Sequence, residues 1–121
     1  MSTPYQKGYQ FELKVKAHLE RLGYTVFRVG GSHTPADLIA ICGSEDNYLF
    51  PEVWLIQCQR SKYFSKDKKN ELIQLAVKSH CKQILAWAED ARKRGNLGVR
   101  FSDDAIINFA PKPPRAIEVE G

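Results

Sequence analysis

Residues 5–23 have the hydrophobic pattern of an amphipathic helix. Apolar side chains recur at intervals of three and four residues, at Phe11, Val15, Leu19 and Leu22. Lys and Glu fill the positions between them, and Gly23 supplies a stop signal at the end. The segment is therefore predicted to form one helix with a single buried face.

The pattern then changes to short runs of β-branched, aromatic and other apolar residues. Residues 24–29, 37–42 and 53–59 form such runs, separated by segments rich in Gly, Ser, Pro and Asn. The last two runs are almost continuously apolar, which is typical of strands buried on both faces. We expect three strands, with the second and third adjacent in the centre of a sheet.

The second half of the chain repeats this alternation of helix and strand. Residues 67–81 again show helical spacing, and residues 83–88 form another buried apolar run. Residues 98–101 and 106–109 are predicted to be edge strands. The predicted order is α-β-β-β-α-β-β, which indicates an α/β fold with a mixed central sheet flanked by helices.

Composition favours a single small domain. The chain has 121 residues, of which 43% are apolar and 26% are charged. We expect the folded domain to span residues 1–110, followed by a proline-rich flexible tail at residues 111–121.

The cysteines and the hydropathy pattern suggest a compartment. Three cysteines without a CxxC pair indicate neither a disulfide framework nor a zinc ribbon. The first residues contain no apolar leader, and no run approaches the roughly 20 apolar residues of a membrane span. A cytoplasmic protein without a membrane segment is expected.

Glu12 is the first candidate functional residue. Steps of three, four and three residues back from Leu22 pass through Leu19 and Val15 of the buried stripe and reach Glu12. Its carboxylate either points toward the core as a functional group or forms a salt bridge at the edge of the buried face. The sequence leaves both interpretations open.

Three further polar residues lie at strand ends. Asp37 begins an apolar strand directly after a glycine-rich loop, where acids also serve as ordinary turn formers. Gln57 and Gln59 share one face at the end of the next strand, although they can also be simple polar residues at a strand end.

Together these residues offer the oxygen ligands that a hard cation prefers. Mg²⁺ typically uses one or two carboxylates, further oxygens and substrate phosphates. The predicted ligands are Glu12, Asp37, the side-chain oxygen of Gln57 and the backbone carbonyl of Cys58, around Mg²⁺ or Mn²⁺. Such an ion would activate water and neutralise charge on a phosphodiester.

At this point the chain resembles a known superfamily over residues 7–109. The resemblance is to the PD-(D/E)XK nucleases, and most nearly to the archaeal-type Holliday junction resolvases. It is carried by Lys7-Gly8 before Glu12, Arg28 with Gly30-Gly31-Ser32, Pro35-Ala36-Asp37, and Leu55-Ile-Gln-Cys-Gln59.

The resemblance implies a restriction-endonuclease-like sheet and a metal-dependent DNA endonuclease that resolves branched DNA as a homodimer. In that family, three acids hold the metal, a lysine orients water, and a loop serine assists near the phosphate. By position, the roles of the three acids fall on Glu12, Asp37 and Gln57, that of the lysine on Gln59, and that of the serine on Ser32. These five residues are the predicted catalytic set.

Two positions depart from the family pattern. Gln57 and Gln59 stand where these nucleases usually carry Glu and Lys. An amide oxygen can bind a metal, but glutamine neither holds a proton nor supplies an ammonium group. The alternative is a weakened or inactive nuclease-fold protein that binds DNA, or a structural subunit that acts on RNA or within a larger complex.

A basic segment follows the third strand. The chain carries 18 Lys+Arg against 14 Asp+Glu, a formal charge of +4 that permits an anionic partner. The predicted DNA-binding residues are Arg28, Arg60, Lys62, Lys66, Lys68 and Lys69. Tyr63 and Phe64 lie among these charges, either to stack on exposed bases or to fold inward into the core.

Overall fold

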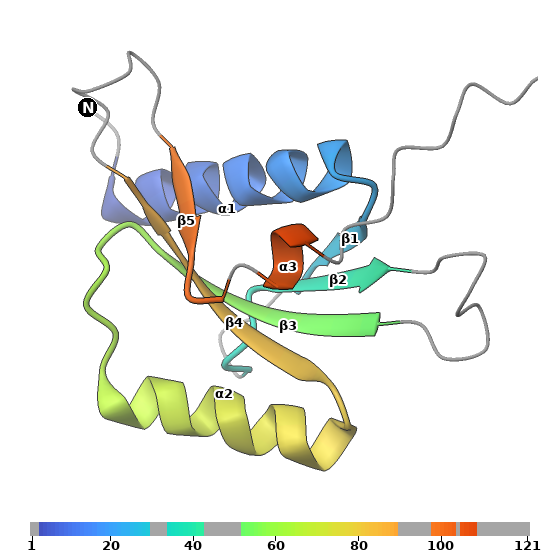
Figure 1. Ribbon diagram of the computed structural model, residues 1–121. Helices are drawn as coiled ribbons and strands as arrows, with labels where there is room; N and C mark the ends of the chain where they lie inside the picture. The colour runs from blue at the N-terminus through green and yellow to red at the C-terminus, as the bar shows by residue number, and fades with distance from the viewer. Residues whose placement is uncertain (1–2, 30–33, 43–51, 90–97, 104, 109–121) are drawn as a thin grey trace, which may run out of the picture.

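The computed structural model describes residues 3–29, 34–42, 52–89, 98–103 and 105–108 (Figure 1). In chain order the elements are α1 (Pro4–Arg21), β1 (Thr25–Arg28), β2 (Leu38–Cys42), β3 (Glu52–Gln59), α2 (Lys66–Ser79), β4 (Lys82–Ala88), β5 (Val99–Phe101) and α3 (Ala105–Asn108). In this part of the chain five strands form one sheet in the order β1-β2-β3-β4-β5. The β3–β4 pair is parallel and the other pairs are antiparallel, so the sheet is mixed.

Helix α1 begins and ends at local sequence signals. Thr3 and Gln6 form a reciprocal capping box, with Thr3 Oγ1 accepting from the Gln6 N–H at 3.1 Å. Gly23, just beyond the helix, has a φ of 101°, a conformation that favours glycine. Between these signals the buried side chains of Phe11, Val15 and Leu19 pack on one face of the sheet.

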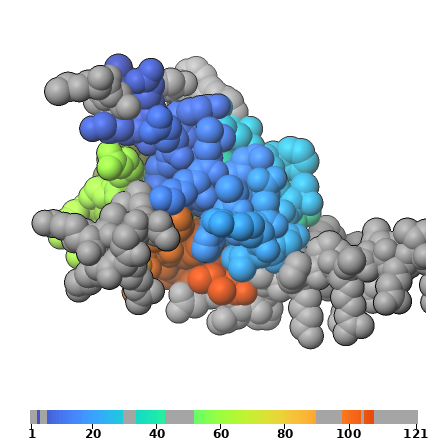
Figure 2. All heavy atoms as spheres, turned by 90° about the horizontal axis from the view of Figure 1, so that it is seen from above, coloured from blue at the N-terminus to red at the C-terminus, as the bar shows by residue number. Residues whose placement is uncertain are grey.

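The two helices α1 and α2 cover opposite faces of the sheet (Figure 1). Trp54 and Ile56 of β3 belong to the core on the α1 side. Leu55 packs with Leu72 and Ala76 on the α2 side. Because side chains alternate along a strand, Gln57 also faces α2. Seen from the α1 side, the helix forms much of the middle of the surface (Figure 2).

The predicted order α-β-β-β-α-β-β is confirmed through β5, but the second of the two predicted edge strands is wrong. Residues 106–109 are not an edge strand, because residues through Asn108 form the short helix α3 and Phe109 lies outside the described residues. The Asp103 carboxylate accepts from the Ala105 N–H at 2.9 Å and starts this turn. Ile106 is fully buried against the α1-side core, which a helical turn allows here.

Among the described helices none is both long and apolar enough to cross a membrane. The predicted flexible tail at residues 111–121 lies outside the described residues.

Candidate functional site

Asp37 is fixed at the point where β1, β2 and β3 meet. Its N–H donates to the Ile56 carbonyl at 2.7 Å, and its own carbonyl accepts from the Val29 N–H at 2.9 Å. Its carboxylate oxygen Oδ2 accepts from the Cys58 N–H at 2.8 Å. Both the backbone and one carboxylate oxygen of Asp37 are therefore held by neighbouring strands.

Glu12 forms a salt bridge at the edge of the buried stripe. Its Oε2 accepts from Arg28 Nε at 2.9 Å, and the Glu12 side chain is only 20% exposed. The Arg28 guanidinium also lies 4.3 Å from the centre of the Tyr9 ring, a cation–π contact. Of the two interpretations that the sequence left open, the structure shows the salt bridge.

Glu12 nevertheless lies close enough to Asp37 for their charges to interact. Burial raises the pKa of the Asp37 carboxyl, and the negative charge of Glu12 raises it further. The Cys58 N–H, Lys68 and Arg28 act in the opposite direction and lower that pKa. Two carboxylates and Arg28 thus lie at one end of the sheet, and the exposed Lys68 of α2 acts on Asp37 from outside it.

The Cys58 thiol lies against the same two acids. Burial raises its pKa well above the ordinary value, and the charges of Asp37 and Glu12 add to this effect. A thiol in such surroundings stays protonated, so Cys58 contributes its backbone rather than its sulfur to the site.

In β3, Gln57 precedes Cys58, whose N–H holds the Asp37 carboxylate. The β2–β3 register ends at the pair of Leu38 and Ile56, and just beyond it the Asp37 N–H donates to the Ile56 carbonyl. The Gln57 side chain is buried, and its Oε1 has no hydrogen-bond partner among the described residues. A buried oxygen without a hydrogen-bond partner costs about 1–3 kcal/mol, so this atom is suited to bind a water molecule or a cation.

Gln59 has a different environment from Gln57. Its amide nitrogen donates to the carbonyls of Ser61, at 3.3 Å, and of Tyr63. The position at which the resemblance puts a water-orienting lysine is therefore occupied by a side chain that holds the following loop.

The donor set fits Mg²⁺ or Mn²⁺ in its chemistry. Asp37 offers a carboxylate within electrostatic range of Glu12, and Gln57 offers a buried amide oxygen on the α2 side. No group of three or more His, Cys, Asp or Glu side chains suited to a metal is found in the described ranges. Mg²⁺ does not need one, since it commonly takes one or two carboxylates and keeps several waters.

The basic segment, residues 60–69, adjoins this site through Gln59. Its cationic side chains are exposed at Arg60, Lys62, Lys66, Lys68 and Lys69. Tyr63 is 77% exposed whereas Phe64 is buried, so one aromatic faces solvent and the other folds inward. The sixth predicted DNA-binding residue, Arg28, lies against Glu12 instead of within this segment.

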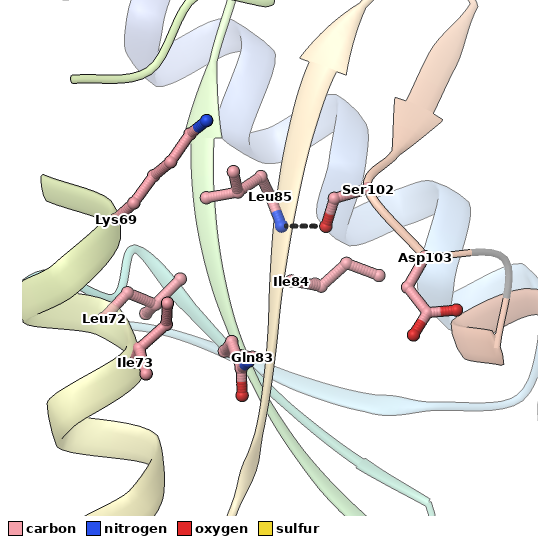
Figure 3. Close-up of a pocket in the computed structure, with 8 residues that line it drawn as sticks. All are labelled: Lys69, Leu72, Ile73, Gln83, Ile84, Leu85, Ser102 and Asp103. Atoms are coloured by element: carbon pink, nitrogen blue, oxygen red, sulfur yellow. Dashed lines mark hydrogen bonds between the residues drawn. The ribbon is translucent and has the colours of Figure 1, made fainter. Parts of the chain in front are cut away.

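A pocket of about 220 Å³ opens on the α2 side of the sheet (Figure 3). It is lined by Lys69, Leu72, Ile73, Gln83, Ile84, Leu85, Ser102 and Asp103. One wall is held by Ser102, whose hydroxyl accepts from the Leu85 N–H at 2.9 Å. None of the predicted catalytic residues lines this pocket, so it is separate from the Asp37 site.

Comparisons with known proteins support the fold. No family model and no curated protein matches the sequence. Solved structures do match, among them a Holliday junction resolvase from the archaeal hyperthermophile Archaeoglobus fulgidus. The chain has a resolvase-like fold. The TM-score is 0.58 at 21% identity, over 78% of this chain and 70% of that one.

Within this resolvase-like fold, sequence reasoning missed two groups around Asp37. One is Lys68, whose charge reaches Asp37 from the first turn of α2 and which was assigned only to DNA binding. The other is Tyr9, whose contact with Arg28 no sequence pattern indicated. Ser32, the remaining predicted catalytic residue, lies outside the described residues.

Proposed function

We propose that this protein binds branched DNA and hydrolyses a phosphodiester bond there with the help of Mg²⁺ or Mn²⁺. One observation carries the proposal. Glu12 and Asp37, 25 positions apart in the numbering, come into electrostatic range at the sheet end where Gln57 leaves a buried oxygen without a partner. The resemblance to a solved Holliday junction resolvase supports branched DNA as the substrate class.

The residues would divide the work as follows. Asp37, Glu12, Gln57 Oε1 and the carbonyl of Cys58 would hold the ion, which would supply activated water and neutralise charge on the phosphate. The Cys58 N–H orients the Asp37 carboxylate. Lys68 adds a positive charge that attracts the phosphate toward Asp37. A homodimer would present two such sites to a substrate with paired cleavage points.

A second candidate is a DNA-binding protein without catalysis. Two observations favour it: Arg28 already neutralises Glu12, and the Gln59 amide is bound to the loop. In this case the acids hold the sheet end together and the basic segment binds DNA.

Cleavage of a four-way junction separates the two candidates. We expect the wild type to cut the junction with Mg²⁺ or Mn²⁺, and Asp37→Asn to lower the rate about a hundredfold or more. The double change Gln57→Glu with Gln59→Lys should raise the rate, because it adds a carboxylate and an ammonium group. Glu71→Gln, on the exposed face of α2, is the matched control.

Duplex and single-stranded DNA of equal length test the preference for branches. If neither the wild type nor the double variant cuts any of these DNAs, while both still bind them, the non-catalytic candidate is correct.

A further inference from the structure

Tyr63 is an exposed aromatic residue on an anchored loop. It follows β3 by four positions and its side chain is 77% exposed, while the next residue, Phe64, is 9% exposed. Phe64 therefore ties the loop to the core and leaves the Tyr63 ring available to a partner.

The backbone around Tyr63 is braced at three points. The Gln59 amide donates to the carbonyls of Ser61 and Tyr63, and the Tyr63 N–H donates to Ser61 Oγ at 3.2 Å. Such bonds fix the direction in which the ring leaves the loop, although the ring itself is in solvent. A group fixed before binding loses less conformational entropy when it binds.

Positive charge surrounds the ring. Lys62 Nζ lies 5.4 Å from the centre of the Tyr63 ring. Further cationic side chains are exposed on both sides of it along the chain, at Arg60, Lys66, Lys68 and Lys69. An aromatic face among exposed cations is suited to a nucleotide whose base stacks while the adjoining phosphates meet lysines.

We infer that Tyr63 is a stacking platform for an unpaired nucleobase, and that Gln59 is a positioning residue that holds it. The inference rests on the DNA binding of the proposed function, but not on cleavage. Bases inside a continuous duplex are already stacked on one another and offer no free face. The platform therefore selects single-stranded or forked DNA over blunt duplex.

The test measures binding without metal, in EDTA, so that cleavage plays no part. Fluorescence anisotropy would give the affinity of wild type, Tyr63→Phe and Tyr63→Ala for a single strand, a fork with unpaired arms and a blunt duplex. Stacking of one base predicts that Tyr63→Ala weakens binding of the single strand and the fork by about 5- to 150-fold. Tyr63→Phe keeps the ring and should stay within about twofold, and duplex binding should change little.

A fluorescent base reports the stacking directly. 2-Aminopurine at an unpaired position should change its emission on binding wild type and Tyr63→Phe, and should change less with Tyr63→Ala. A purely structural role for Tyr63 would alter the thermal unfolding of the protein without this base-specific response.

The role of Gln59 is tested by a pair of variants of similar length. Gln59→Lys keeps a donor for the two loop carbonyls, whereas Gln59→Leu removes it. We expect Gln59→Leu to reduce the preference for the fork over the duplex, whereas Gln59→Lys should keep the preference of the wild type.

The outcomes separate this inference from the proposed function. Tyr63→Ala binding all three DNAs like wild type overturns the platform and leaves cleavage of branched DNA untouched. An equal loss on the single strand and the duplex also overturns it, because that result indicates a backbone contact. If wild type binds no DNA at all, both proposals fail.

Discussion

Two adjoining regions of the molecule use charge in opposite ways. At the end of the sheet, Glu12 pairs with Arg28, and the Asp37 carboxylate accepts from the Cys58 N–H, all partly buried. In the basic segment at residues 60–69, five cationic side chains and a single acid, Asp67, are exposed to solvent. Balanced, partly buried charges fix a local geometry, whereas unbalanced exposed charges attract a distant anion and are screened by salt.

Gln59 marks the boundary between the two regions. It is the last residue of β3, and its amide holds the loop that opens the basic segment. Its hydrogen bonds tie this boundary residue to the basic segment, although the resemblance assigns its position to catalysis.

The largest expected effect tests the basic segment. Lys66→Glu with Lys69→Glu should weaken binding of all DNA sequences, because exposed lysines contact phosphates and not bases. The slope of log K against log salt should fall by about 1.8 if each lysine neutralises one phosphate. Anisotropy titrations between low and physiological salt would measure both.

The control for this change carries the same charge difference elsewhere. Lys14→Glu with Lys78→Glu alters exposed positions on α1 and at the far end of α2. If this control weakens binding as much as the first pair, net charge is responsible and the basic segment is not the binding surface.

A smaller effect tests the partly buried pair. A double-mutant cycle with Glu12→Gln and Arg28→Met, followed by urea unfolding, should give a coupling free energy of about 1 kcal/mol, at the upper end for such pairs. The reason is the low exposure of the two side chains, 20% for Glu12 and 34% for Arg28.

The pair Lys16–Glu20 offers a matched comparison on the same helix. Its shortest distance is 3.2 Å, but its acid is more exposed, since Glu20 is 46% exposed against 20% for Glu12. Lys16, at 29%, is close to Arg28 in exposure. A helical pair of this spacing is worth about 0.3–0.5 kcal/mol. Equal coupling in the two cycles would contradict a special role of burial at Glu12.

The smallest effect concerns pH. Because burial raises the pKa of Asp37 in the folded state, its contribution to stability is complete below the ordinary value of 3.8 and is lost as pH rises through the folded pKa. Asp37→Asn does not titrate and should gain stability relative to wild type over this range. Urea unfolding from pH 3 to 7 would show it, with Glu71→Gln following the wild-type curve.

The opposite trend, in which wild type gains on Asp37→Asn as pH rises, would mean that the Cys58 N–H and the nearby cations outweigh burial.

Most of the fold could be predicted because each element has its own local pattern. The stripe of Phe11, Val15 and Leu19 defined α1, and the apolar runs defined the strands. The prediction of an edge strand at residues 106–109 was wrong. Ile106 and its neighbours have high strand propensity, but tertiary burial and the Asp103 turn favour a helix. Asp103, whose carboxylate starts the turn, is a residue type that favours helix starts.

The candidate site could be predicted only in its components. The inward position of Glu12 and the strand-end position of Asp37 are sequence properties. The contact of Glu12 with Arg28 depends on how α1 lies across β1, which periodicity does not specify. The use of the Gln59 amide depends on how the chain bends after β3, and the strand pattern ends there.

The hydrogen bond between Tyr24 and Ile106 also bears on how the chain folds. The buried Tyr24 hydroxyl donates to the Ile106 carbonyl at 2.7 Å and joins positions 82 residues apart. Closing so long a loop before the intervening strands pair would lose chain entropy that few contacts repay, so this contact is expected to follow sheet formation. We therefore expect the turn at α3 to form late in folding.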